Sequence, residues 1–212
     1  MNRYEENNKL NRAHVILLML FFAALILSVI KPKSYLTWIL EAFPIFIGIL
    51  ILIFTYKKFQ FTTFVYALIL IQIILILIGA HYTYGEVPLF NWIKKAYGLN
   101  RNHYDRLVHF IQGFIAAFIT RELLVRKLKL KKGIILSLLV VCICLSLSAF
   151  YELIEWGIAM IAGEKANDFL GFQGDIWDTQ WDMFWGLIGS IISVSSFYRI
   201  HDRYIDKLEK HH

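Results

Sequence analysis

Residues 35–80 read YLTWILEAFPIFIGILILIFTYKKFQFTTFVYALILIQIILILIGA, and this stretch decides the fold class. It consists of two apolar runs, 35–54 and 61–80, separated by a short break that contains Lys57 and Lys58. A helix crosses a bilayer core of about 30 Å with roughly 20 apolar residues. Each run has that length, so the stretch predicts two membrane-spanning helices joined by a short turn.

The same pattern continues on both sides of this stretch. Further apolar segments occur at about 15–30, 107–125, 134–154 and 183–197, and the one that begins at Ile134 continues to Ile161. Of the 212 residues, 58% are hydrophobic and only 18% are charged, against about 25% in soluble proteins. We therefore predict an all-α, polytopic transmembrane helix bundle with six spans. The long fifth span would tilt or extend past the lipid surface.

The formal net charge of +6 raises the question of nucleic-acid binding. Nucleic-acid binding needs basic residues that cluster on a folded face. Residues 14–80 contain only five charged residues. Four of them lie at breaks between apolar runs, namely Lys31, Lys33, Lys57 and Lys58, and the fifth, Glu41, lies within the run at 35–54. We therefore expect the lipid bilayer as a partner, and no nucleic acid.

The orientation follows from the 22 lysines and arginines. With the N-terminus inside, the inner segments hold more of them than the outer segments, which hold only Lys31, Lys33, Lys94, Lys95, Arg101, Arg106 and Lys165. We predict that both termini are cytoplasmic. Residues 1–212 then form a single membrane domain: three apolar spans in 14–80, a motif-bearing half with three spans and two outer loops in 81–198, and a cytoplasmic tail in 199–212. The tail is expected to be a short solvated helix.

Ionisable side chains concentrate at the outer ends of the last three spans. Within a membrane such side chains are costly, so they mark a functional site by default. Each of the three spans carries a pair one turn apart on one helix face. The pairs are Asp105 and His109 in NHYDRLVHF (102–110), Glu152 and Glu155 in YELIEW (151–156), and Asp178 and Asp182 in QGDIWDTQWDM (173–183).

These pairs are predicted to meet, because a rise of about 1.5 Å per residue places all three at one depth. Together with Asp175, so many carboxylates would repel one another unless protons, Arg101 and Arg106, or a metal ion neutralised them. Mixed Asp, Glu and His ligands suit one divalent ion: Zn, Mn, Fe or Mg. The metal ligands that we predict are Asp105, His109, Asp178 and Asp182. The catalytic residues that we predict are Glu152, Glu155 and Asp175, with Glu152 or Glu155 as general base.

Structural roles are the alternatives for several of these residues. Asp105 and Asp178 each precede an apolar helix and could be N-caps, and His109 could be a hydrogen-bonded interior histidine. Glu41, in the second span, could approach the same site. Gly186 and Ser190 are expected to let two helices pack closely. Four tryptophans are most simply interfacial belt residues: Trp156, Trp177, Trp181 and Trp185.

The motifs also resemble a known family. HYTYGEVP (81–88), RNHYDR (101–106), YELIEW (151–156) and QGDIWDTQWDM (173–183) resemble the YjdF-type predicted inner-membrane proteins of bacteria, across about residues 79–190. The order of the acid-and-His helix, the Glu helix and the Asp helix also resembles, at fewer positions, the VanZ-like proteins linked to teicoplanin resistance. The resemblance implies a multi-pass protein of the bacterial cytoplasmic membrane and a site at these motifs. It implies no reaction.

Three classes of function follow from these residues. The first is a metal-dependent hydrolase or transferase that acts on a lipid-linked envelope substrate at the outer membrane face. The second is a transporter, although transport sites usually lie near the midplane between repeats, and no internal repeat is visible. The third is a lipid-binding or antibiotic-binding membrane protein without catalysis, in which the carboxylates form a structural polar network.

Overall fold

The computed structural model describes residues 3–163 and 173–210. These residues form helices and short connections, and no strand occurs among them. In chain order the elements are α1 (Arg3–Val29), α2 (Tyr35–Tyr56), α3 (Thr63–Tyr82), η1 (Tyr84–Glu86), α4 (Pro88–Tyr97), α5 (Tyr104–Glu122), η2 (Leu123–Lys127), α6 (Ile134–Ala162), α8 (Asp178–Ser196) and α9 (Tyr198–Glu209). The structure confirms the predicted all-α class.

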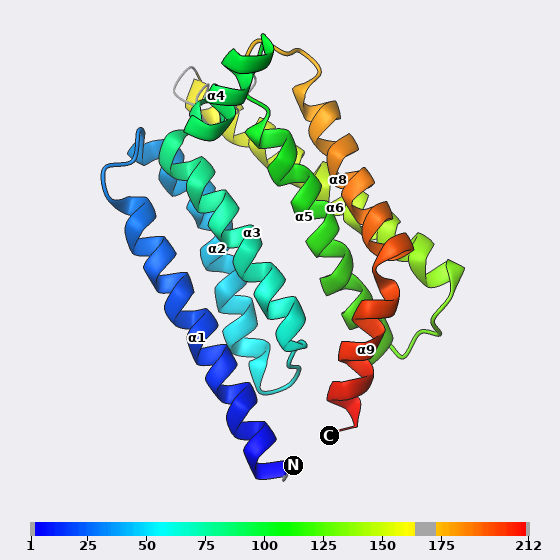
Figure 1. Cartoon of the computed structure of the whole chain (residues 1–212). Coiled ribbons are helices and arrows are strands. Elements are labelled where there is room, and N and C mark those ends of the chain that lie inside the picture. Colours follow the sequence, from blue (N-terminus) through cyan, green and yellow to red (C-terminus); the bar gives the residue numbers. More distant parts are fainter. Residues whose placement is uncertain (1–2, 164–172, 211–212) are drawn as a thin grey trace.

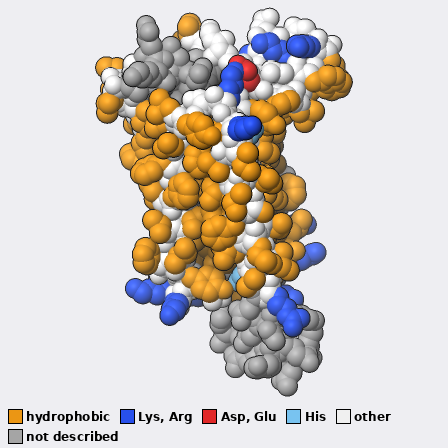
Figure 2. Space-filling view, turned by 90° about the vertical axis from the view of Figure 1, so that its left-hand side faces the viewer, with side chains coloured by type: hydrophobic (Ala, Val, Ile, Leu, Met, Phe, Trp, Pro, Cys, Tyr) orange, Lys and Arg blue, Asp and Glu red, His pale blue; other side chains and the backbone are white. Residues whose placement is uncertain are grey.

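Five helical segments are long and apolar enough to cross a membrane: α1, α2, α3, α5 continued by η2, and α6. α8 and α9 pass the same test together, and they meet at a bend of 66°. Five of the six predicted spans thus correspond to continuous helices, and the sixth corresponds to this bent pair, which forms either a broken span or a re-entrant loop. Figure 2 shows the broad band of apolar side chains on one face of the bundle, with lysine and arginine side chains at both of its edges.

Both chain ends lie at the same end of the bundle (Figure 1), which we call the inner end; the opposite end is the outer end. That the inner end faces the cytoplasm stays a prediction from the distribution of lysine and arginine. The long helix α6 runs obliquely across the bundle in Figure 1, and this tilt accommodates its length.

Helix α5 is the centre of the bundle. It packs against α8, α6 and α3, while α3 also contacts α1 and α2. Glycines allow α5 and α8 to approach closely: a Cβ atom added at Gly113 would collide with the carbonyl oxygen of Gly186, and one at Gly189 with that of Phe110. Gly113 and Gly189 are thus the glycines that this close approach requires, whereas a Cβ atom added at Gly186 would lie 3.7 Å from the nearest atom of α5, so the role predicted for Gly186 stays a prediction.

A buried carboxylate joins three elements at the inner end. Oε1 of Glu122 accepts hydrogen bonds from the Thr62 backbone N–H at 2.7 Å and from Arg126 Nη1 at 2.6 Å. Its Oε2 accepts from the Thr62 hydroxyl at 2.8 Å and lies 3.1 Å from His201 Nε2. Because these partners come from the start of α3, from η2 and from α9, the network ties both halves of the chain together.

The C-terminal tail forms the expected helix, α9, but this helix is not fully solvated. His201, Ile205 and Leu208 are buried. Arg121 of α5 donates to Asp202 at 2.8 Å and so anchors α9 from the side. The solvated-helix prediction is therefore wrong for one face of α9, because its apolar residues repeat at helical spacing and pack against the bundle.

The first of the two predicted outer loops, which joins the apolar segments at 61–80 and 107–125, also contains helical structure. Tyr84 of η1 is buried beneath Gly79, where an added Cβ would meet its ring at 2.6 Å. The next helix, α4, begins with Pro88 and ends at Gly98, which adopts the left-handed conformation with φ of 62°. None of its residues is buried, and Trp92 is largely exposed, as an interfacial helix requires. Of the second outer loop, residues 164–172, including Lys165, lie outside the described residues.

Candidate functional site

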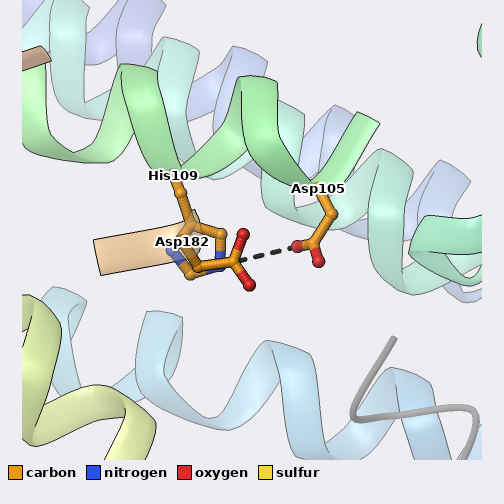
Figure 3. Close-up of side chains that lie close together, drawn as sticks. All are labelled: Asp105, His109 and Asp182. Atoms are coloured by element: carbon orange, nitrogen blue, oxygen red, sulfur yellow. Dashed lines mark ion pairs between the residues drawn. The ribbon is translucent and has the colours of Figure 1, made fainter. Parts of the chain in front are cut away.

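Three of the predicted ligands converge at the outer end of the bundle. Candidate donor atoms of Asp105, His109 and Asp182 all lie within 4.8 Å of one another. Figure 3 shows Asp105 and His109 on successive turns of α5 and the carboxylate of Asp182 reaching the same point from α8. Each side chain is buried, with at most 7% of its residue exposed. We call these three residues the outer cluster.

The close contact between α5 and α8 explains the convergence. Gly186 lies one turn beyond Asp182, and its carbonyl oxygen is so near α5 that a Cβ atom added at Gly113 would collide with it. Without side chains between the two backbones, carboxylates on α8 reach side chains on α5. Within the outer cluster, His109 Nε2 lies 3.5 Å from Asp105 Oδ1.

Two arginines balance the remaining aspartates. Arg101 forms a close ion pair with Asp178, and Arg106 donates to Asp175 at 2.6 Å. Arg101 Nη1 also lies 3.4 Å from Asp175, and its Nη2 lies 3.8 Å from Asp105. The structure therefore brings Asp105, His109 and Asp182 together, but it pairs Asp178 and Asp175 with the arginines. The expectation that Arg101 and Arg106 lie near the site is confirmed.

These ion pairs perturb the groups that lie outside the membrane spans. Burial alone would lower the pKa of Arg101, but the hydrogen bond and charge of Asp178 hold that pKa above its ordinary value. The Trp177 backbone N–H, followed by the charges of Arg106 and Arg101, lowers the pKa of Asp175. Both groups are thus held in their charged forms beside the outer cluster.

The N-cap alternative is wrong for both aspartates. The N-cap residue of α5 is His103 and that of α8 is Trp177, and neither makes a capping hydrogen bond through its side chain. Asp105 and Asp178 lie inside the first turns of these helices, where their carboxylates contact Arg101.

A cavity of about 210 Å³ adjoins the outer cluster. It lies between the two halves of the bundle, because α2, α3, α5 and α6 all contribute to its lining. The polar lining residues are Glu41, Gln72, Tyr84, Asp105, His109, Gln112, Tyr151 and Glu155. The expectation that Glu41 approaches the site is confirmed, and its side chain is buried.

Gln72 and Tyr151 are members of the site that sequence reasoning missed. Gln72 is a single amide in the apolar run LILIQIILIL (68–77), a signal that could have identified it. Both polar atoms of its side chain are buried without a hydrogen-bond partner. Tyr151 lies directly before Glu152 and could have been read as an interfacial aromatic residue.

The two predicted catalytic glutamates take different places. Glu155 lines the cavity, whereas Glu152 is buried and interacts with the side chain of Thr179 at the start of α8. Oε1 of Glu152 has no hydrogen-bond partner, and neither does Oδ1 of Asp182. Buried polar atoms without partners are rare, so the outer end has unused capacity to bind a cation, a proton or water.

Comparisons with known proteins agree with this architecture. The chain matches the family described as "Predicted membrane protein (DUF2238)" over residues 13–203. It is 41% identical to the inner membrane protein YjdF of Escherichia coli (strain K12) over 179 residues, which are 84% of this chain and 86% of that protein. No solved structure matches the chain significantly.

Fold and sequence together define a multi-pass helical membrane protein, and the predicted membrane localisation is confirmed. The chain belongs to the DUF2238 family of predicted membrane proteins. The resemblance to YjdF-type proteins is likewise confirmed.

Proposed function

We propose that the outer cluster binds one divalent metal ion and that the protein is a hydrolase or transferase of phosphorylated, lipid-linked envelope substrates. One observation carries the proposal: Asp105, His109 and Asp182 bring buried donor atoms within 4.8 Å of one another. Such a mixed nitrogen and oxygen set suits Zn, Mn or Fe, and also Mg if water completes the shell.

Charge balance supports a bound cation. Arg101 and Arg106 are already paired with Asp178 and Asp175. Asp105 lies 3.5 Å from His109 and 3.8 Å from Arg101, whose closest partner is Asp178. The buried Glu41 and Glu152 add further acidic groups near Asp105 and Asp182. Burying several carboxylates near one another is unfavourable unless they are protonated or bound to a cation.

Separate roles follow for the residues around the outer cluster. When bound, a divalent ion supplies Lewis acidity toward a phosphoryl oxygen or a water molecule. Glu155, on the wall of the adjoining cavity, would accept the proton of an attacking water or hydroxyl group. Nε and Nη2 of Arg101 and Nε of Arg106 are buried N–H groups without acceptors, and they would donate to phosphate oxygens. Asp175 and Asp178 then act as positioning residues for these arginines.

The location supports a substrate that is anchored in lipid. The site lies at the outer end of the spans, where we expect the phosphate of a membrane-anchored substrate. A cavity of about 210 Å³ is below the usual size of a whole ligand site, and it suits a headgroup whose lipid tail stays in the bilayer.

Metal analysis of the purified full chain tests the ion. The protein in detergent is exposed to Zn, Mn, Fe or Mg and then desalted. We expect about one bound metal ion per chain, measured by inductively coupled plasma mass spectrometry. Asp182→Asn should lower the occupancy at least tenfold. Asp206→Asn, at the exposed end of an inner ion pair, is the matched control and should keep full occupancy.

Phosphate release from polyprenyl phosphate and diphosphate lipids tests the reaction. We expect metal-dependent release that Glu155→Gln abolishes while leaving the bound metal unchanged. If the folded protein retains no stoichiometric ion after exposure to any of the four metals, the proposal that the outer cluster binds a metal ion is wrong. If the ion binds but no phosphorylated lipid is turned over, the proposed enzymatic activity is wrong. A binding or transport role is then the better explanation.

A further inference from the structure

A second candidate site lies at the inner end, opposite the outer cluster. A depression of about 660 Å³ opens between the α2–α3 connection, the end of η2 and the end of α9. Its charged lining residues are Lys57, Lys58, Arg126, Lys127, Lys129 and Glu209. The lining is therefore strongly basic, and we call this depression the inner basic pocket.

Most of this positive charge has no carboxylate partner among the side chains that the structure describes. Lys129 lies 3.6 Å from Glu209, in an exposed pair. Arg126 is held in place by Glu122 at 2.6 Å and by stacking over the ring of Phe59. Within residues 12–161 and 173–210, whose side chains the structure describes, Lys57, Lys58 and Lys127 have no carboxylate partner.

An apolar groove of about 460 Å³ adjoins the inner basic pocket. It runs between α1, α2 and α3, and Tyr56 lines both the groove and the pocket. Its walls are almost entirely apolar, with Leu17, Phe21, Leu52 and Ile53 among them. The α1 side of the bundle is the face that Figure 2 presents, and between its two basic edges the side chains there are overwhelmingly apolar.

Polar groups occur only at the end of the groove nearest the pocket. Nδ1 of His14 lies 2.8 Å from the hydroxyl of Tyr56, and its Nε2 lies 3.1 Å from the hydroxyl of Thr63. The pocket and the groove thus form one continuous amphipathic surface. A cationic pocket lies at the inner end, hydrogen-bonded side chains lie at the junction, and a hydrophobic groove continues along the spans.

We propose that this combined site binds an anionic phospholipid, with its phosphate headgroup in the inner basic pocket and an acyl chain in the groove between α1, α2 and α3. Basic residues at this end are expected from membrane orientation alone. The groove is the independent observation, since a soluble anion has no use for it. A second copy of the chain would bring two basic surfaces together. Lysine and arginine pockets between spans are suited to anionic headgroups.

Lipid binding to the delipidated full chain tests the proposal. The probes are dioleoyl phosphatidylglycerol, dioleoyl phosphatidylcholine with the same acyl chains, and glycerol 3-phosphate as a headgroup without chains. Native mass spectrometry in detergent measures each affinity. We expect phosphatidylglycerol to bind at least tenfold more tightly than phosphatidylcholine, and glycerol 3-phosphate to compete only weakly.

Two kinds of variant separate headgroup from chain. The double variant Lys57→Gln, Lys58→Gln should reduce the preference for phosphatidylglycerol to less than threefold. The double variant Lys94→Gln, Lys95→Gln removes the same charge from α4 at the outer end and should leave the preference unchanged. Leu52→Trp fills the groove and should weaken the binding of both phospholipids by similar factors.

The results that overturn the proposal are distinct. Equal affinity of the unaltered protein for both phospholipids shows that the basic pocket does not select a headgroup. Competition by glycerol 3-phosphate at concentrations comparable to the lipid shows a site for soluble anions instead. None of the residues in the inner basic pocket or the groove belongs to the outer cluster. The outcome of this test is therefore independent of whether the proposed enzymatic activity is confirmed.

Discussion

Replacing Asp182 by asparagine should stabilise the metal-free protein while removing its response to metal. The carboxylate is buried in the outer cluster, and its Oδ1 has no hydrogen-bond partner. Asparagine has nearly the same shape but no charge. If the Asp182 carboxylate serves folding, its replacement by asparagine should lower the stability of the protein. If it serves to bind a cation, the same replacement should raise the stability of the protein when the cation is absent.

The magnitude follows from the geometry. Donor oxygens of Asp105 and Asp182 lie within 4.8 Å. With an effective dielectric constant of about 20, two unit charges at that distance repel by about 3.5 kcal/mol. His109, 3.5 Å from Asp105, offsets part of this repulsion. We therefore expect a gain of about 1–3 kcal/mol, which raises the melting temperature by about 2–4 °C per kcal/mol for a chain of this size.

Asp178 supplies a control one turn away on the same helix. Asp178→Asn breaks a buried ion pair and leaves Arg101 with Asp175 at 3.4 Å as its nearest remaining acid. Breaking such pairs costs about 3–5 kcal/mol, and we expect the lower end of that range. The two substitutions, chemically identical and four residues apart, should thus shift stability in opposite directions.

The assay is thermal unfolding in detergent, followed by tryptophan fluorescence, with and without a chelator. For the unaltered protein, an ion at a hundredfold excess over its dissociation constant adds about 2.7 kcal/mol. Asp182→Asn should show no such addition. If Asp182→Asn loses stability in the chelator to the same extent as Asp178→Asn, the outer cluster is a structural polar network and our reasoning is refuted.

Three further predictions concern the rest of the bundle, each read from thermal unfolding in detergent. Glu122→Ala removes the common acceptor of the inner network and should cost about 3–5 kcal/mol, whereas Glu86→Ala, in an exposed ion pair, should cost less than about 1 kcal/mol. Gly113→Ala should force α5 and α8 apart and cost about 3 kcal/mol, while Gly48→Ala, which meets open space, should be neutral or slightly stabilising; equal effects would contradict the packing. The pKa of Asp175 is lowered in the fold, so its stabilisation is complete above its unfolded pKa of about 3.9 and is lost as the pH falls through the lower folded value. Asp175→Asn should therefore reduce the loss of melting temperature between pH 7 and pH 3, and an unchanged loss would exclude this ion pair as the cause.

The spans could be predicted because hydropathy and length are properties of the chain itself. The segments predicted at 35–54 and 61–80 became α2 (Tyr35–Tyr56) and α3 (Thr63–Tyr82) with small shifts. The helix in the outer loop was missed, although Pro88 and Gly98 are the ordinary signals for its two ends. The bend between α8 and α9 could not be predicted, because it depends on what the buried face of α9 contacts.

The candidate site was predicted in part for the same reason. The i,i+4 spacing of Asp105 and His109 requires them to share a face of α5, whatever surrounds it. Asp178 and Asp182 have the same spacing, so their sequence does not distinguish them. They differ in the structure because Asp178 lies nearer the outer loop and meets Arg101, whereas Asp182 lies one turn deeper and meets His109.

The sequence by itself determined that this is a helical membrane protein and which spans carry its acidic residues. That information is local, because each helix in lipid must satisfy its own backbone and present apolar side chains along its own length. Only the tertiary structure decided which carboxylates meet, that Glu41 and Gln72 join them, and that a basic pocket continues into an apolar groove. Those features depend on the rotation and separation of helices distant in sequence, which close contacts such as Gly113 against Gly186 set.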